Sequence, residues 1–417
     1  MINLVNKFKF DVSATYHCCF FVALLSLIPK ITFTQSSNIG IPPITNFYKK
    51  DYQAGTQTWD ITQDKNGVLY FANNQGLLEF DGVNWNIYPV SNQTIVRSVK
   101  IDTDGKIYVG AQNELGYFEA DEHGVLIYHS LVPLLSTNLK SVADIWDIEI
   151  VGEAIYFRTG SNVLLYQNNQ ITEIYNNGNL TYLTQIEQTL YLHDTKKGVL
   201  RYNGTQFKTH IPLALLEDVA ISSIMPHKND TLLVGTIKKG LFLYANEQLM
   251  PWKINDNNLI REGRVYCSAT IDEETYAFGT SLNGLFIVNN DGKVIKYINN
   301  KSGLQVNNTL SVFVDKKQNL WTGLNHGIAL IEISSPFSNI QPDENTKAAG
   351  YSTQVFDNKI YLGTSSGAYY TDWKQYYNPT QQFPFQKLPK TDGQVWNLIA
   401  DRQTCPSVLG SFWKGNC

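Results

Sequence analysis

Apolar residues return along the chain in short runs with a period of about 40 residues. The best copies are Ile107–Ala111, Leu232–Thr236, Leu320–Leu324 and Ile360–Thr364, and each holds glycine as its fourth residue. Aromatic and β-branched residues in such short runs are typical of strands. A period near 40 with strand-type residues is the signature of a β-propeller, in which each repeat forms one blade.

Each repeat predicts four short strands bounded by turns. A typical unit opens with alternating apolar residues, as in 311–315, and continues through a polar turn such as 102–105. A central strand with an aromatic residue, a third strand such as 241–244 and a weaker fourth strand such as 84–88 follow. We interpret the glycines as residues that the repeat needs for turns at strand ends.

The repeats also predict the domain organisation. Units begin near Trp59, Val96, Ile145, Tyr182, Ile221, Val265 and Leu310. The seventh lacks a clear fourth strand, whereas residues 44–48 form a spare strand ahead of the first unit. Because a propeller must protect the edges of its first and last blades, we expect the spare strand to complete the seventh blade.

The predicted fold is therefore all-β. A seven-bladed propeller of four-stranded blades covers residues 36–338 and is closed by an N-terminal strand, and residues 339–349 form a linker. Residues 350–417 hold the first one and a half blades of a second propeller, which stops in mid-blade. We expect the chain to be the front part of a longer protein.

The N-terminus has the pattern of an export signal. Lys7 and Lys9 precede an apolar run over residues 18–28. This run is too short to cross a bilayer easily but has the length of a signal-peptide core. Residues 1–35 are therefore predicted to be a signal peptide, with an uncleaved anchor as the alternative, and the rest of the chain is predicted to be periplasmic. The cysteines that remain, Cys267, Cys405 and Cys417, give no disulfide framework.

Composition and motifs indicate little chemistry. The formal net charge is −4 and no basic cluster occurs, so we expect no nucleic-acid partner. Neither H-x-x-x-H nor C-x-x-C spacing occurs, and no catalytic or phosphate-binding glycine motif is present. The sequence thus predicts no enzyme activity, no metal site and no cofactor.

Aromatic residues provide the candidate ligand site. Trp59, Trp146 and Trp396 recur at the start of a repeat, on a strand that lies near the central channel of propellers. They either pack between blades or form a stacking platform for a sugar ring at the channel mouth. We take these three tryptophans as the candidate ligand-binding residues.

The repeat resembles a known class. The pattern of residues 311–333 and 107–117 is similar to the two-component-regulator propeller repeat. Residues 41–88, with Asn46-Phe47, 51–55 and 76–82, resemble the start of Bacteroidetes sensors that carry a triple-tyrosine domain. The resemblance implies two periplasmic propellers, followed by a triple-tyrosine domain, a membrane helix and a kinase or DNA-binding output. Those later parts are absent from this sequence.

The resulting expectation is a non-catalytic sensory propeller of a signal-transduction regulator. Its partner would be a glycan or another small extracellular ligand, with membrane contact only through the N-terminal segment or the downstream parts. The full-length protein would be anchored in the inner membrane and could dimerise. Two alternatives stay open: an exported carbohydrate-active propeller enzyme of the lyase or sialidase type, and a protein-interaction scaffold. The enzyme would require acids, Arg and Tyr converging at one channel mouth.

Overall fold

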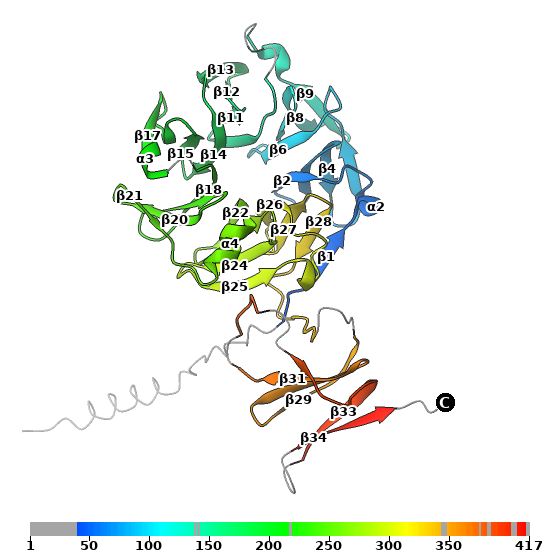
Figure 1. Ribbon diagram of the computed structural model, residues 1–417. Helices are drawn as coiled ribbons and strands as arrows, with labels where there is room; N and C mark the ends of the chain where they lie inside the picture. The colour runs from blue at the N-terminus through cyan, green and yellow to red at the C-terminus, as the bar shows by residue number, and fades with distance from the viewer. Residues whose placement is uncertain are drawn as a thin grey trace, which may run out of the picture. The chain divides into compact units, whose positions relative to one another are not determined.

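The structure is a computed structural model that describes residues 40–136, 139, 142–216, 219–342, 348–374, 377–381, 385–401 and 407–413. The predicted signal peptide lies outside these residues. Between residues 44 and 331, the described strands form seven four-stranded antiparallel sheets. Figure 1 shows these sheets arranged around a common centre. The β-propeller predicted from the repeats is confirmed.

The strands of the first four sheets follow one another along the chain. They are β2 (Thr58–Gln63), β3 (Leu69–Asn73), β4 (Gly76–Phe80) and β5 (Trp85–Tyr88); β6 (Val96–Ile101), β7 (Ile107–Ala111), β8 (Glu114–Ala120) and β9 (Leu126–Ser130); β10 (Asp147–Val151), β11 (Ala154–Arg158), β12 (Val163–Gln167) and β13 (Gln170–Tyr175); β14 (Leu180–Ile186), β15 (Thr189–Asp194), β16 (Gly198–Tyr202) and β17 (Phe207–Pro212).

The next three sheets complete the ring. They are β18 (Ile221–Pro226), β19 (Leu232–Thr236), β20 (Gly240–Ala245) and β21 (Gln248–Pro251); β22 (Val265–Asp272), β23 (Thr275–Thr280), β24 (Leu285–Asn289) and β25 (Val294–Ile298); β26 (Thr309–Val314), β27 (Leu320–Leu324), β28 (Ile328–Ile331) and β1 (Ile44–Phe47). Short helices α2 (Lys49–Tyr52), α3 (Leu213–Leu216) and α4 (Asn257–Gly263) and two 3₁₀ turns, Val132–Leu134 and Asn300–Ser302, lie in the connections.

The first strands of successive sheets contact one another in a closed cycle. The contacts run from β2 to β6, β10, β14, β18, β22 and β26, and β26 contacts β2. Each sheet is therefore a blade, and its first strand is the one nearest the axis. This arrangement places the side chains of seven equivalent strands around one central cavity.

The last blade is completed from the N-terminal side of the ring. β1 pairs antiparallel with β28, with Ile44 opposite Ile331 and Phe47 opposite Ile328. The Phe47 ring stacks on Trp321 with a centroid distance of 5.7 Å and contacts Trp85 at 5.3 Å. The pairing supplies the strand that the seventh repeat lacks, and Phe47 ties this blade to the first one.

The polar turns of the repeat follow one pattern. Asp64 Oδ1 accepts hydrogen bonds from the backbone amides of Asn66 and Val68, both at 2.8 Å. Gly67 in the same turn has φ +94°, a value that favours glycine. The turns that begin at Asp102, Asp121 and Asp315 repeat the carboxylate-to-amide bonds. Hairpin turns thus explain the Asp-rich segments without a bound ion.

The two glycines of the repeat have different roles. Gly240 and Gly327 follow the second strand with φ of +89° and +100°, as turn residues do. Gly110 instead lies inside β7 opposite Ser98, and a Cβ there would be 2.4 Å from Cγ2 of Ile145 at the next blade. Our interpretation of the glycines as turn residues is therefore wrong for the first one. The first glycine, such as Gly110, instead lets the first strand of the next blade approach closely.

The hydrophobic core lies between the blades. The aromatic residues at the repeated central position are buried there: Tyr70, Tyr108, Tyr156, Tyr191 and Trp321. Each joins a cluster that combines apolar residues from neighbouring blades, as Tyr108 does with Ile148 and Phe157. The aromatic residue of the central strand therefore packs between neighbouring blades.

A further set of strands follows residue 349. β29 (Gly350–Phe356), β30 (Lys359–Thr364), β31 (Gly367–Asp372) and β32 (Gln386–Lys387) form a four-stranded sheet, and β33 (Gln394–Asp401) pairs with β34 (Ser407–Trp413). β33 contacts β29 and β30, as the inner strand of a neighbouring blade would. In the described part of the chain, no helix has the length and apolar character needed to cross a membrane.

Candidate functional site

The central cavity has a volume of about 410 Å³ and is lined by the first strands of all seven blades. In six blades, one residue near the start of the first strand has no partner on the second strand, which is a β-bulge. In the third blade, the residue at the equivalent position lies just before β10. These residues, here called the bulge ring, are Trp59, Arg97, Trp146, Thr181, Ser222, Tyr266 and Leu310. Because a bulge redirects a side chain, the repeated bulge turns one residue per blade toward the cavity.

Three neighbouring members of the bulge ring, Trp59, Arg97 and Trp146, contact one another. The Arg97 guanidinium lies 4.2 Å from the Trp59 ring centroid and 4.7 Å from that of Trp146. Its Nε donates to Asp144 Oδ2 at 3.1 Å. The Trp59 indole N–H donates to Asn74 Oδ1 at 2.7 Å, so the ring is held in one orientation. Cation–π contacts of this kind fix both indoles and the guanidinium together.

The structure brings two of the three predicted ligand-binding tryptophans together. Trp59 and Trp146 both line the cavity, with ring centroids 6.1 Å apart. Arg97 lies against each indole, so one ring surface of each is already in contact with the protein. Trp396 does not line this cavity: it occupies the bulge of β33 and stacks on Tyr351, the bulge residue of β29, at 4.3 Å.

The residue that follows the bulge on the first strand of each blade pairs with glycine on the second strand in four blades and with a larger residue in three. In the second, fifth and seventh blades a serine of the first strand faces a glycine of the second, as Ser98 faces Gly110, and the sixth blade has Cys267 opposite Gly279. In the other three blades the pairs are Asp60 with Ala72, Asp147 with Arg158, and Tyr182 with His193. The departures from the repeat are therefore gathered in blades one, three and four.

These exceptional residues still connect neighbouring blades. Ser98 Oγ donates to the carbonyl of Ile145 at 3.1 Å, which is the ordinary link. Asp60 instead accepts from the backbone amide of Val99 at 3.0 Å, and Asp147 accepts from that of Leu183 at 2.8 Å. The other oxygen of Asp60 accepts from the backbone amide of Ile61 at 2.9 Å. Backbone hydrogen bonds thus account for both oxygens of Asp60 and one of Asp147, but they do not require a charge where serine suffices.

A charged pair lies two residues further along the strands. Lys100 Nζ is 3.2 Å from Glu149 Oε2. Burial raises the pKa of Glu149 to about 7, against the opposing effect of Lys100, and burial raises the pKa of Asp60 to about 6. Burial lowers the pKa of Lys100, but Glu149 and Asp60 outweigh it and the net shift is upward. Both carboxyl groups therefore change charge near neutral pH.

The opposite side of the cavity is less polar. Leu310, Val312, Phe313 and Ile221 line it from blades five and seven. Ser222 is 8% exposed, and its hydroxyl oxygen has no hydrogen-bond partner among the described residues. The cavity therefore has a charged side on blades one to four, an apolar side, and a buried polar atom that lacks a partner.

Sequence reasoning missed Arg97, Glu149, Arg158 and Tyr266. A signal was available for Arg158, because it occupies the second-strand position at which four other copies of the repeat hold glycine. In the described part of the chain, no three His, Cys, Asp or Glu residues gather closely enough to hold a metal ion. The chemistry of the cavity is that of hydrogen bonds, ion pairs and aromatic contacts.

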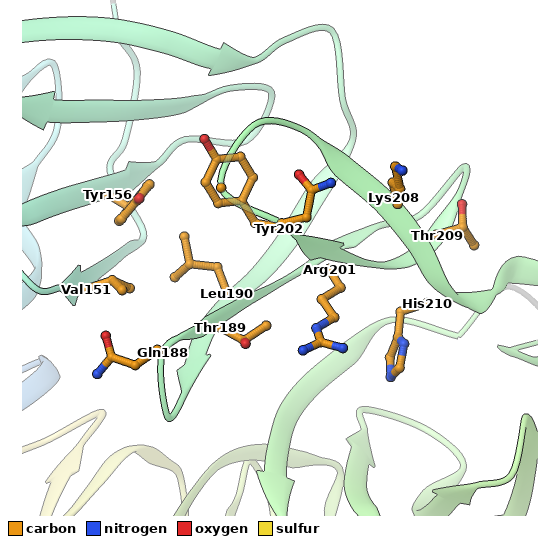
Figure 2. A pocket seen from close by; sticks show the side chains of 12 residues that line it. Val151, Tyr156, Gln188, Thr189, Leu190, Arg201, Tyr202, Lys208, Thr209 and His210 are labelled. Carbon is orange, nitrogen blue, oxygen red and sulfur yellow. The ribbon is translucent and has the colours of Figure 1, made fainter.

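A second cavity, of about 530 Å³, lies at the ends of strands in the third and fourth blades (Figure 2). The side chains of Arg201 and His210 extend in the same direction there. Lys208 on β17 is the residue opposite Arg201 on β16. Tyr202 is next to Arg201 on β16, so alternation places it on the other face, where it contacts Tyr156. The basic groups and the aromatic rings therefore do not converge, and the central cavity is the better candidate.

Comparisons with known proteins give no relative by sequence, since no known sequence family and no curated protein matches this chain. Among solved structures, the extracellular domain of BT4673 from B. thetaiotaomicron, a proposed one-component system, matches with a TM-score of 0.57 and 18% identity over 86% of this chain and 50% of that one. Virginiamycin B lyase from Staphylococcus aureus matches with a TM-score of 0.54 and 14% identity, over 70% of this chain and 99% of the lyase. The WD40 propeller domain of Doa1 matches with a TM-score of 0.53 and 9% identity, over 70% of this chain and 96% of that domain.

These likenesses are of fold. This chain spans half the length of the BT4673 domain that it matches. The neighbours include both a regulator's extracellular domain and a lyase, so the fold alone does not decide between binding and catalysis. The kind of protein that the sequence resemblance implied is nevertheless found among the neighbours, as the extracellular domain of a one- or two-component system.

Proposed function

We propose that this propeller is the exported sensory region of a signal-transduction regulator and that it binds a small extracellular ligand in the central cavity. One observation carries the proposal: the residues that break the repeat gather on the wall of that cavity. Asp147 with Arg158 and Tyr182 with His193 replace the small pairs that suffice elsewhere. Packing alone gives no reason for this replacement.

The cost of these residues supports the same proposal. Charged and polar groups that leave water destabilise a fold unless each finds partners, whereas serine and glycine avoid most of that cost. Arg158 is only 4% exposed, and Asp60 and Glu149 have raised pKa values because they are buried. A binding site for a polar ligand explains why the chain retains them on one wall.

The cavity also suits a glycan or a similar small molecule. It has indole rings at Trp59 and Trp146, and hydrogen-bonding groups and an apolar wall lie within the same space. Sugar rings bind where aromatic faces and polar groups converge, and a cavity of a few hundred Å³ is the usual size of a small-molecule site. The regulator would be anchored through its N-terminal segment or through downstream parts, and its full-length form would dimerise.

An exported lyase is the second candidate, because the cavity meets the condition set for it. Acids, arginines and tyrosines do converge there: Asp60, Asp147, Glu149, Arg97, Arg158, Tyr182 and Tyr266. Glu149, with its pKa near 7, could accept a proton at neutral pH. Against this candidate, both arginines are tied to neighbouring carboxylates, Arg97 to Asp144 and Arg158 to Asp147.

A ligand titration tests the proposal. The chain from residue 40 onward is titrated with maltose, cellobiose, xylobiose and D-glucuronate, while tryptophan fluorescence and melting temperature are recorded. We expect saturable binding that Trp146→Ala weakens about tenfold, because loss of a stacking contact removes roughly 1–1.5 kcal/mol. Trp373→Ala is the matched control, since Trp373 is 40% exposed and does not line the cavity.

Two results would change the conclusion. Binding that Trp146→Ala leaves unchanged would place the ligand elsewhere on the molecule. Conversion of a bound probe to a new product, detected by mass spectrometry and abolished by Glu149→Gln while binding persists, would establish the lyase instead.

A further inference from the structure

The bulge ring holds several hydrogen-bond donors without protein partners. Within the described residues, the terminal nitrogens of Arg97 make no hydrogen bond, and the same holds for the hydroxyl groups of Ser222 and Tyr266. Ser222 is more than nine-tenths buried, so its hydroxyl cannot easily turn to bulk water instead. A buried hydroxyl without a hydrogen-bond partner lowers the stability of the fold. Where such a hydroxyl lines a cavity, a ligand atom or a bound water is the expected partner.

Arg97 is the most strongly fixed of these donors. Its guanidinium contacts two indole rings, at 4.2 and 4.7 Å from their centroids, and its Nε donates to Asp144. Its side chain is only 12% exposed, so little rotational freedom remains to be lost when a ligand binds. A planar fork of N–H groups held in place in this way matches the two oxygens of a carboxylate.

The charges around Arg97 are almost balanced. Asp144 is its direct partner, and Asp60, Asp147 and Glu149 line the same cavity together with Lys100 and Arg158. Tyr266 lines the same cavity from the sixth blade. Burial raises the pKa of its hydroxyl, with Cys267 adding to the rise, and Arg97 and Arg158 oppose this only in part, so the hydroxyl keeps its proton. A protonated hydroxyl on the wall of the cavity that Arg97 also lines is a further donor for an anionic group bound there.

We propose that Arg97 binds a carboxylate group of the ligand, with Tyr266 and Ser222 as further donors, so the sensed molecule is a small organic acid such as an acidic sugar. This inference rests on the proposed function, because it assumes that the central cavity is the binding site. It deepens that proposal by naming the chemical class of ligand. Asp144 sets the strength of binding, because its charge offsets part of that of Arg97.

The test uses pairs of probes that differ only in charge. D-Glucuronate is compared with D-glucose, D-galacturonate with D-galactose, and benzoate with benzamide. Two variants are measured beside the wild-type chain: Arg97→Lys, which keeps the charge but loses the planar fork, and Asp144→Asn, which keeps an acceptor for Nε but removes the opposing charge. Circular dichroism and melting curves verify that both variants are folded.

The expected effects have opposite signs. Arg97→Lys should weaken binding of the acids about tenfold, because it loses charge-assisted bonds, whereas Asp144→Asn should strengthen it several-fold. Affinity for the neutral probes should change less than about twofold in either variant. A purely structural role for Arg97 predicts instead that both variants weaken all probes together, or that neither does.

Three outcomes would overturn the inference. One is binding of the neutral probes as tightly as the acids, and another is an affinity for acids that Arg97→Lys does not lower. The third is absence of acid binding by the wild-type chain up to about 10 mM, beyond which affinity is too weak for a specific site. If neutral sugars bind and Trp146→Ala weakens them, the proposed function stands although the acid specificity is wrong.

Discussion

Asp147 and Arg158 face each other across β10 and β11, at the position where other blades pair a serine with a glycine. The Asp147 carboxylate accepts from Arg158 Nε and also from the backbone amide of Leu183 in the next blade. Arg158 in turn donates to the carbonyl of Leu180 at 3.0 Å. One ion pair thus joins two blades at the cavity wall, where it serves stability and shapes the site.

Asp147→Ala should destabilise the propeller by about 3 kcal/mol, because it leaves Arg158 buried without its carboxylate. Asp291→Ala is the matched control: its partner Lys228 is 3.2 Å away, but the side chains are 74% and 47% exposed. Exposed pairs contribute less than about 1 kcal/mol, so the control should be nearly neutral. Urea unfolding followed by fluorescence measures both, and equal midpoints for the two variants would contradict the structural role of the buried pair.

Gly110→Ala should also destabilise the propeller, by about 1–3 kcal/mol, because the added methyl group would overlap Ile145 and the Ser98 hydroxyl, which lie 2.4 and 2.5 Å from its position. Gly160→Ala is the control, since nothing lies within 4 Å of a Cβ at Gly160 and its φ is not in the left-handed region. Thermal melting of the two variants decides the matter. A Gly110→Ala protein as stable as the parent would mean that the blades can move apart at little cost.

The cavity carboxyl groups make stability depend on pH. The pKa of Glu149 is raised to about 7 and that of Asp60 to about 6, mainly by burial, from ordinary values near 4. The folded chain therefore binds more protons than the unfolded chain between these values, so the free energy of unfolding rises as pH falls through the folded pKa values. These two carboxyl groups should therefore raise the melting temperature as pH falls from about 7.5 to 5, whereas His193, His210 and His227, whose pKa values are lowered mainly by burial, destabilise the fold over the same range.

Glu149→Gln is the variant for that prediction, because it removes the group with the higher of the two pKa values. Between about pH 7.5 and pH 5, the melting temperature of the parent minus that of the variant should increase by about 2–4 °C, because the histidines contribute equally to both chains. Carboxylates with lowered pKa values, such as Asp194, lose their stabilising effect only at lower pH, so they do not reverse the trend in this range. An identical pH profile in the parent and the variant would show that Glu149 is not the group that titrates.

Sequence reasoning predicted the architecture because the fold repeats, and each copy reinforces the others. It also found Trp59 and Trp146, which stand out as large aromatic residues at the start of a repeat. It did not find Arg97, since an arginine on a strand gives no signal until the register aligns it with those tryptophans. The first glycines were misread for a related reason: close approach between blades is a property of the assembled ring, whereas turn chemistry is visible locally.

The closure of the ring gives the last prediction. β1 covers the edge of β28, and Phe47 contacts Trp321 and Trp85. Deletion of residues 41–50 should therefore expose a strand edge and remove an aromatic contact between the seventh and first blades, which favours aggregation. The control is a chain that lacks only residues 1–39 and so keeps β1. Size-exclusion chromatography and thermal melting compare the two: we expect the control to elute as a discrete species and the longer deletion to aggregate or to melt far lower. If both chains elute and melt alike, pairing of β1 with β28 does not hold the ring closed, and the edge of the seventh blade must be protected in another way.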